Sequence, residues 1–351
     1  MTSRASGSTR RITLKELAAY LEVSTATVSN AFNRPDQLSS ALRTRILEAA
    51  AQLGYSGPNS LARGLRTGKS GIVGVSLSDN LGYSLNDPVA NQFLSGVAEV
   101  LDAHDRKLLL LPGRSEHRKQ ALTAVADGYI LYGAQTGLVP SEMSLGDQNP
   151  IVTVDFSFSG LPSVQIDNYQ ASKRIAQWAL SRGSLKSVAI LALRLTKQSL
   201  NGRVRHHQLD NGDNAIARIR YEGFRAALRE AGIAMKDVSV WNVDINSYEA
   251  ATPVVEQLFD DHVPTLLLCM SDRLALTALT VAEQRALNVP EQLRITGFDG
   301  IEEGQRRAPQ LTTVFQDSRL KGYIAAQRVL GMLSDDQLIL PSWMIFADSC
   351  P

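Results

Sequence analysis

Five side chains between residues 25 and 30 have the types and spacing needed to contact the bases of DNA. They are small or uncharged and fall outside the apolar positions of a helix: Thr25, Ala26, Thr27, Ser29 and Asn30. Such short side chains let a helix approach base edges in the major groove and hydrogen-bond them. A helix side that only faces water more often carries Glu and Lys. The pattern favours a DNA-reading helix; the alternative is a small helical module that binds protein.

Two helices around a tight turn are predicted to position these residues. Thr13 and Glu16 have the spacing of a capping box, in which each side chain satisfies a backbone N–H at the start of a helix. Apolar residues then recur at helical spacing, at Leu14, Leu17, Ala18 and Leu21. Ser24 is a suitable N-cap for the second helix, which would bury Val28, Ala31 and Phe32. A third helix is predicted from about Ser39 to Leu53, with Gly54 ending it.

The charge of the chain is divided unevenly between its two parts. Residues 1–70 hold ten Lys and Arg against four acidic residues, a net charge of +6, and the remainder has a net charge of −5, which together give +1. Because DNA phosphates attract cations, a basic N-terminal part on an acidic body is expected when only that part meets nucleic acid.

Beyond residue 71 the sequence predicts parallel α/β sheets. Short apolar runs lie at 72–77, 107–111, 128–132, 151–156, 187–193, 238–243, 265–270 and 293–298. Helical patterns such as 169–182, 216–231 and 272–286 lie between them, which is typical of parallel sheets covered on both faces. About 280 residues exceed what one such core usually holds, so two lobes are expected.

Three carboxylates lie at the end of, or just after, predicted strands or apolar runs. They are Asp155, Asp167 and Asp272. Ligands of open parallel sheets bind outside the carboxyl ends of the strands, which here predicts a site between the lobes. Carboxylates suit a polar or polyhydroxylated ligand because they hydrogen-bond it directionally. Each of them, taken singly, could instead cap a helix or form a surface ion pair.

Over nearly its whole length the chain resembles the lactose-repressor (LacI/GalR) family of bacterial transcriptional regulators. The stretch TLKELAAYLEVSTATVSNAFN resembles the family's head, and LGYSGPNSLARGLRTG resembles its linker. DNYQ, RYEGFRAAL, SDRLALTAL, ITGFDG and QLTTV follow in the family's order to about residue 315. The resemblance implies an all-α helix-turn-helix head and an α/β core of two parallel-sheet lobes of the periplasmic-binding-protein type.

The resemblance also implies how the domains are arranged. A flexible tail is expected at 1–10, the head at 11–57, a hinge helix and linker at 58–70, and an effector-binding and dimerisation core at 71–351. Lobe 1 is expected at about 71–160 and 298–316, and lobe 2 at about 163–294 and 317–351. The chain would cross between the lobes near 156–164, 293–298 and 313–317.

Within the head, the resemblance assigns roles to individual residues. Thr25, Ala26 and Asn30 occupy places where the family reads bases, and phosphate-contact places are occupied by Thr13, Ser24, Asn33 and Ser39. Asn30 stands where the family usually has an arginine. Asn pairs best with adenine and Arg with guanine, so the half-site should differ from the common family palindrome at that base. Glu22 stands where a turn glycine is common, so this turn is expected to tolerate a side chain or to be strained.

The linker is expected to order on DNA. Pro58 can begin a helix, but the helix from Asn59 to Leu65 is barely two turns long and contains Gly64, so it is marginal alone. The resemblance implies that Leu65 enters the minor groove as an apolar wedge, beside Asn59, Ala62 and Arg63.

In the core, Arg220 resembles the family's ligand-binding arginine. Residues 79–92 form a longer loop than the family usually has and supply Tyr83 in place of paired phenylalanines. The polar stretch 194–214 is an insertion. With Asp155, Asp167 and Asp272, these residues suggest that a small polar effector, a sugar or related metabolite, controls binding to a palindromic double-stranded DNA operator. Because one head reads half of a palindrome, a homodimer is expected.

Other classes of protein receive little support from the sequence. His206 and His207 are adjacent and point apart, so no metal site is expected, and no cofactor motif occurs. A sugar or nucleoside hydrolase would need an activated nucleophile or acid/base pair, so an enzyme is not expected. A solute-binding protein with the same core is opposed by the head and by an N-terminus without a secretory signal. With no run long enough to span a membrane, a bacterial cytoplasmic, nucleoid-associated location is expected.

Overall fold

The computed structural model describes residues 12–55, 57, 69–111, 126–133, 149–158, 160–205, 208–209, 215–334 and 337–351. It divides the chain into two compact units, the head (Met1–Gly71) and the core (Ile72–Pro351). Among the described residues of head and core, no helix is long and apolar enough to cross a lipid bilayer.

The head folds around a small apolar centre, as predicted. Its described elements are α1 (Leu14–Leu21), α2 (Thr25–Asn33), the 3-10 helix η1 (Pro35–Gln37) and α3 (Ser40–Gln52). The capping box is present, because Thr13 N donates to Glu16 Oε2 at 2.8 Å and Glu16 N donates to Thr13 Oγ1 at 3.3 Å. Leu17, Val28 and Ile46, one from each α-helix, are fully buried in the same cluster.

The turn between α1 and α2 accepts a side chain in a strained conformation. Glu22 is the C-cap of α1 with a φ of 55° in the left-handed region, and its N–H donates to the carbonyl of Ala19 at 3.3 Å. Most side chains avoid this region because the Cβ atom approaches the following carbonyl oxygen, whereas glycine does not. The expectation from the sequence is therefore confirmed.

The core contains two sheets that are mostly parallel. In the described residues, sheet A has the strand order β12-β5-β4-β3-β1-β2, and sheet B has the order β13-β11-β10-β9-β6-β8-β7. Among the described strand pairs, only β11–β13 and β7–β8 are antiparallel. The strands of sheet A are β1 (Ile72–Leu77), β2 (Lys107–Leu111), β3 (Gly128–Tyr132), β4 (Ile151–Val154), β5 (Ser163–Ile166) and β12 (Gln337–Leu340). Those of sheet B are β6 (Val188–Leu193), β7 (Gly202–Val204), β8 (Val238–Val243), β9 (Leu266–Cys269), β10 (Arg294–Asp299), β11 (Thr312–Gln316) and β13 (Ser342–Ile345).

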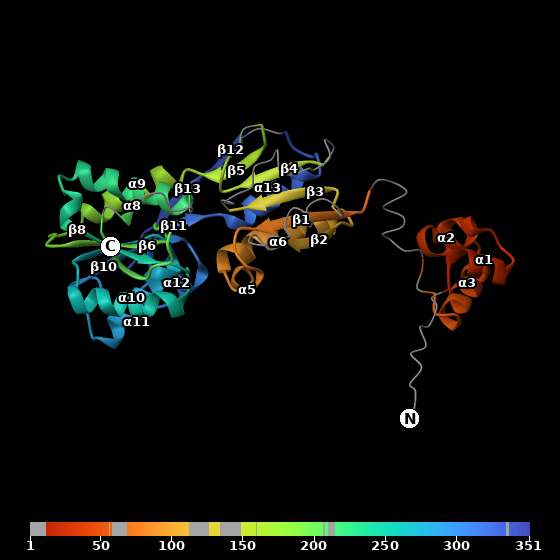
Figure 1. Ribbon diagram of the computed structural model, residues 1–351, viewed down its shortest axis with the longest axis horizontal. Coiled ribbons are helices and arrows are strands. Elements are labelled where there is room, and N and C mark those ends of the chain that lie inside the picture. Colours follow the sequence, from red (N-terminus) through yellow and green to blue (C-terminus); the bar gives the residue numbers. More distant parts are fainter. Residues whose placement is uncertain are drawn as a thin grey trace, which may run out of the picture. The chain divides into compact units, whose positions relative to one another are not determined.

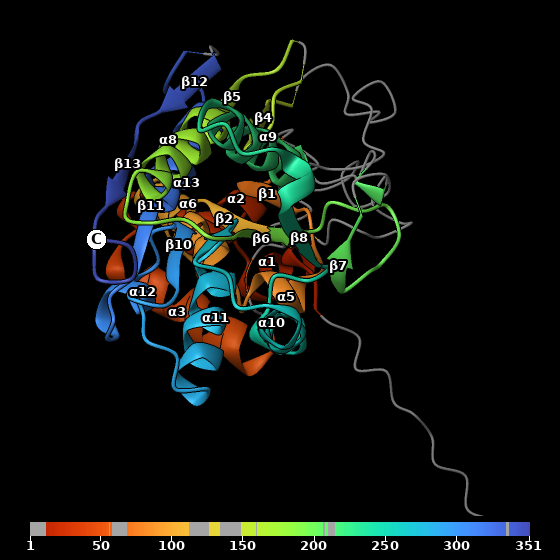
Figure 2. The ribbon, with the colours of Figure 1, turned by 90° about the vertical axis from the view of Figure 1, so that its left-hand side faces the viewer.

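Helices cover both faces of sheet B. Figures 1 and 2 show α8 and α9 on one face and α10 and α11 on the other, and each pair packs into its own apolar cluster. The described helices of the core are α5 (Leu81–Ser84), α6 (Pro88–Ala103), α8 (Asn168–Leu180), α9 (Ala215–Glu230), the 3-10 helix η4 (Met235–Asp237), α10 (Tyr248–Asp261), α11 (Asp272–Gln284), α12 (Glu302–Arg306) and α13 (Ser318–Val329). The predicted fold class is thus the observed one.

Two pairs of helices approach so closely that glycine is required between them. A Cβ atom at Gly96 of α6 would lie 1.9 Å from the carbonyl oxygen of Arg319, and one at Gly322 of α13 would lie 2.0 Å from that of Phe93. Gly223 of α9 faces the backbone of α8 in the same way, with the Tyr169 oxygen at 2.5 Å. The α6–α13 contact therefore packs a helix near the end of the core sequence against a helix near its beginning.

The chain crosses between the two sheets at Asp167, Asp317 and Pro341, so the predicted lobe boundaries need correction. The described residues of lobe 1 lie within 72–166 and 318–340, and those of lobe 2 within 168–316 and 342–351. The crossings expected near 156–164 and 293–298 are wrong, because β5 pairs in sheet A and β10 remains in sheet B. The segment 298–316 belongs to lobe 2, whereas α13 and β12 belong to lobe 1. Local apolar patterns do not reveal these pairings, which depend on contacts distant in sequence.

Candidate functional site

The predicted base-reading residues all lie on α2. Thr25 and Ala26 are exposed, whereas Thr27, Ser29 and Asn30 are half-buried. Ser24 caps the helix by accepting from Thr27 N at 3.0 Å. The helix therefore presents small polar groups outward while Val28 and Ala31 fix its buried side.

Side chains on this helix also bond to each other. Thr27 and Ser24 share a hydroxyl contact of 2.7 Å, and Asn33 donates to the carbonyl of Ser29 at 2.9 Å. Asn30 donates from Nδ2 to Oε1 of Gln37 in η1 at 3.1 Å. Thr25 and Ala26 thus remain the most outward residues of the set.

Three of the four predicted phosphate contacts are helix N-caps. Thr13, Ser24 and Ser39 cap α1, α2 and α3, and each accepts a hydrogen bond from a backbone N–H of the first turn. The remaining first-turn N–H groups and the helix dipole make a helix N-terminus favourable for phosphate. The fourth residue, Asn33, is exposed at the end of α2. The hinge residues Asn59, Ala62, Arg63 and Leu65 lie outside the described residues.

In the core, five polar side chains form a buried network where the lobes meet, which we call the interlobe cluster: Asp155, Arg220, Asp299, Gln316 and Lys321. Lys321 of lobe 1 donates to Asp155 Oδ1 at 2.6 Å and to Gln316 Oε1 of lobe 2 at 2.7 Å. Gln316 in turn donates to Asp299 Oδ1 at 2.7 Å. The network therefore runs continuously from one lobe into the other.

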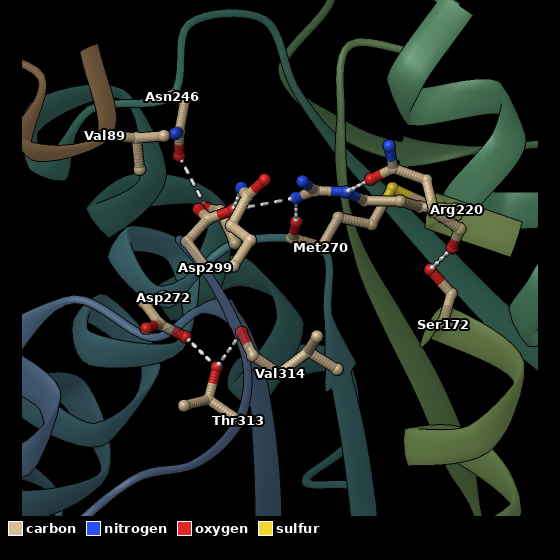
Figure 3. Close-up of polar contacts among 12 residues, drawn as sticks. Val89, Ser172, Arg220, Asn246, Met270, Asp272, Asp299, Thr313 and Val314 are labelled. Atoms are coloured by element: carbon tan, nitrogen blue, oxygen red, sulfur yellow. Dashed lines mark hydrogen bonds and ion pairs between the residues drawn. The ribbon is translucent and has the colours of Figure 1, made fainter. Parts of the chain in front are cut away.

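Arg220 is the most constrained cation of the interlobe cluster. Its Nε donates to Asn168 Oδ1 at 2.9 Å, and its Nη1 donates to the carbonyl of Met270 at 2.5 Å and to Asp299 at 3.2 Å. The guanidinium lies over the ring of Phe298, 3.6 Å from its centroid. Figure 3 shows Arg220 reaching across toward Met270 and Asp299. Its planar group is thus held at the carboxyl ends of β9 and β10.

The predicted effector residues are placed differently from one another. Asp155 and Arg220 belong to the interlobe cluster, whereas Asp167 caps α8, accepting from Gln170 N at 2.9 Å. Asp272 is fully buried beneath the cluster and accepts from Thr313 Oγ1 at 2.5 Å and from Ile301 N at 2.8 Å. Burial, together with the neighbouring Asp299 carboxylate, raises the pKa of Asp272 to about 7.

Sequence reasoning missed Asp299, Gln316 and Lys321. Asp299 directly follows the predicted run 293–298, so the rule that selected carboxylates at strand ends could have found it. Lys321 carried no signal, because it is a lysine within a helix and its burial depends on α13 packing across sheet A.

Tyr83 contributes to a second contact between the lobes. Its hydroxyl donates to the carbonyl of Asn246 in lobe 2 at 3.3 Å, and Nη1 of Arg273 donates to the same oxygen at 2.9 Å. Nη2 of Arg273 donates back to the carbonyl of Asn86 in lobe 1. Burial, then the charge of Asp299, raises the pKa of the nearby Asp87 to about 6. The segment 79–92, expected to be a long loop, instead contains α5 and the start of α6, and through Tyr83 and Asn86 it contacts lobe 2.

No group of His, Cys, Asp or Glu among the described residues is arranged to hold a metal ion. His206 and His207, which sequence reasoning set aside as ligands, lie outside those residues.

A helix-turn-helix head and a two-lobed α/β core with a polar junction define a DNA-binding regulator built on a periplasmic-binding-protein-like core. Residues 13–59 match the model of bacterial regulatory proteins of the lacI family, and residues 203–342 match that of the periplasmic binding protein-like domain. A transcriptional regulator of Mycolicibacterium smegmatis is 36% identical over 332 residues, covering 89% of this chain and 88% of that protein.

Two further proteins extend the comparison. The transcriptional repressor CytR of Escherichia coli is 30% identical over 318 residues, covering 87% of this chain and 84% of CytR. The crystal structure of a LacI-family transcriptional regulator from Corynebacterium glutamicum has a TM-score of 0.71 at 29% identity, covering 96% of this chain and 98% of that one. The chain belongs to the LacI family and is a DNA-binding transcriptional regulator, not an enzyme.

Proposed function

We propose that this regulator is a homodimeric repressor, acting in the cytoplasm, that binds a palindromic operator and is controlled by a neutral polar effector at the interlobe cluster. Similarity to the repressor CytR supports the repressor role. The observation on which effector control rests is the cluster itself, in which Lys321 of lobe 1 and Gln316 of lobe 2 are bonded within a network of two buried ion pairs.

Buried charges at this position are costly for the fold alone. Removing ions from water costs several kcal/mol each, and apolar residues of similar volume often stabilise a protein as well or better. Lys321 is fully buried and Arg220 is 4% exposed. Their position at the carboxyl ends of parallel strands, where α/β proteins bind ligands, supports a binding role for them.

The pairing within the cluster favours a ligand without negative charge. Lys321 is already bonded to Asp155, and Arg220 to Asp299 and a carbonyl. A phosphate or carboxylate would thus compete with existing ion pairs and approach Asp87 as well. The hydroxyl groups of a sugar or related polyol would form hydrogen bonds with these side chains without adding charge.

Control of the operator would follow from a two-state equilibrium. An effector that prefers one lobe arrangement shifts the population toward it, and the shift equals its difference in affinity for the two states. Because each head is joined to lobe 1, the arrangement of two lobe 1 units in a dimer would set the spacing of the heads.

The test combines operator binding with a ligand screen. DNA is first selected from a random pool by the purified protein, and neutral sugars, polyols and sugar phosphates are then screened by thermal shift and by fluorescence anisotropy of the operator complex. We expect a neutral compound to raise the melting temperature and to change operator affinity. Stabilisation by anionic compounds alone would contradict the proposed effector class, and absence of any selected sequence would contradict the operator.

Variants localise the effect to the cluster. Asp299→Asn should abolish the ligand-induced thermal shift, while operator binding without ligand persists. Arg285→Met is the matched control. Arg285 forms an ion pair of 2.7 Å with Asp260, and this pair lies on the α10–α11 side of lobe 2, away from the cluster. An unchanged ligand response in Asp299→Asn would place the effector elsewhere.

A further inference from the structure

The bond between Asn30 and Gln37 joins the reading helix to the turn that follows it. Asn30 is half-buried on α2, and Gln37 is exposed at the end of η1. The distance from Asn30 Nδ2 to Gln37 Oε1 is 3.1 Å. Since two flexible surface side chains rarely gain much from one neutral hydrogen bond, its value depends on how firmly each partner is held.

The backbone around Gln37 is firmly held. Pro35 fixes one backbone angle at the start of η1, Gln37 N donates to the carbonyl of Arg34 at 3.1 Å, and Leu38 packs against the apolar centre of the head. Arg34 N in turn donates to the carbonyl of Asn30 at 2.8 Å. The turn therefore returns Gln37 to the last turns of α2 in a fixed register.

The bond leaves a defined set of groups on Asn30. An amide nitrogen has two N–H groups, and one of them is used by Gln37. The other N–H and the Oδ1 acceptor remain for a partner. Adenine presents a matching pair in the major groove, an acceptor at N7 and a donor at N6. With the amide oriented in advance, less rotational freedom is lost when DNA binds.

We propose that Gln37 is a specificity-determining positioning residue, which orients the amide of Asn30 for bidentate recognition of an adenine. This inference rests on the proposed operator reading by α2, and it adds a residue outside that helix. Gln37 acts through Asn30, so its removal should weaken discrimination at one base pair without an equal loss at the others.

The experiment is a double-mutant cycle read out by sequence selection and by anisotropy, using the full-length protein. Wild type, Gln37→Leu, Asn30→Ala and the double variant are each measured on the selected operator and on three operators substituted at the base pair that Asn30→Ala identifies. Gln37→Leu keeps the size of the side chain but removes the acceptor. Gln52→Leu, at an exposed glutamine near the end of α3, is the matched control.

We expect wild type to prefer A·T at that pair by about 5- to 150-fold, the range for one bidentate contact. Gln37→Leu should reduce this preference by about two- to tenfold, the range for an immobilised side chain, and should change nothing further in the Asn30→Ala background. Gln37→Glu keeps the acceptor, so it should retain the preference while binding every sequence more weakly because of its charge.

Three results would overturn the proposal. They are an equal loss at all base pairs in Gln37→Leu, an unchanged preference in that variant, or a further change in the Asn30→Ala background, which would mean that Gln37 reads a base itself. Circular dichroism of each variant checks that the head is folded. If wild type selects no sequence at all, the proposed operator reading fails instead, and the two failures are thereby distinguished.

Discussion

Replacing Lys321 with Met should destabilise the core more than any exposed substitution. The lysine is fully buried, and its two bonds hold Asp155 at 2.6 Å and Gln316 at 2.7 Å. Met has a similar length but no charge, so the variant leaves the Asp155 carboxylate, 8% exposed, without its cation. Breaking a buried ion pair from one side typically costs about 3–5 kcal/mol.

This cost translates into a large shift of the melting temperature. One kcal/mol corresponds to roughly 2–4 °C in domains of 150–250 residues, so a loss of about 6–20 °C is expected. Thermal unfolding followed by circular dichroism at a fixed protein concentration measures the shift.

A second substitution and a control test the reasoning. Lys321→Met combined with Asp155→Asn removes both charges, so it should recover much of the lost stability. Lys236→Met, at an exposed lysine of η4, should change the melting temperature little. The reasoning is refuted if Lys321→Met costs no more than Lys236→Met, or if the double variant is no more stable than Lys321→Met alone.

Four other substitutions have defined outcomes. Glu22→Gly should stabilise the head by about 1 kcal/mol, because glycine adopts a φ of 55° without strain, and a lower urea midpoint would contradict this. Gly322→Ala should destabilise the core by at least about 2 kcal/mol, since its Cβ would lie 2.0 Å from a backbone oxygen, whereas Gly331→Ala is strained only in its backbone. Arg273→Leu should speed hydrogen exchange at 81–84, with 168–180 as the internal reference, because the charged hydrogen bond from Arg273 to lobe 1, worth about 1.5–3 kcal/mol, is lost. Asp272→Asn should flatten the dependence of stability on pH. Since the folded pKa of about 7 lies above the ordinary 3.8, Asp272 lowers stability as pH rises from about 4 to 7, by up to about 1.4 kcal/mol per pH unit. If the free energy of unfolding in urea changes with pH equally in Asp272→Asn and wild type, Asp272 is not the cause.

The three α-helices of the head, within residues 12–55, could be predicted from the sequence, because their signals are local. Thr13 and Glu16 fix one helix start, Ser24 and Ser39 fix two others, and each of these caps is observed. Even the unusual Glu22 turn follows from the absence of a glycine between two helical patterns. The strand positions of the core are also local, and most of them match the predicted apolar runs.

The assembly of the lobes and half of the core site could not be predicted in this way. Asp167 and Asp317 begin α8 and α13 with nearly the same backbone angles, φ −77° and ψ 83° against φ −79° and ψ 84°, but only the pairing of distant strands shows that both are crossings. Asp272 looked like a cap or a ligand, whereas Ser271 is the cap and Asp272 is buried beneath the cluster. Burial of this kind depends on which elements meet in space.

The order of the crossings has a consequence for synthesis on the ribosome. Lobe 1 begins at residue 72 but lacks α13 and β12 until residue 340 has emerged, and lobe 2 lacks β13 until residue 345. The face of α6 against which Gly322 packs therefore remains exposed to solvent while more than two hundred further residues are synthesised. Domains usually fold as units once their segments are available, and exposed apolar surfaces aggregate in the interval. A nascent chain stalled before residue 318 would thus contain a folded head and two unfinished lobes, so the last few dozen residues decide whether the whole core can fold.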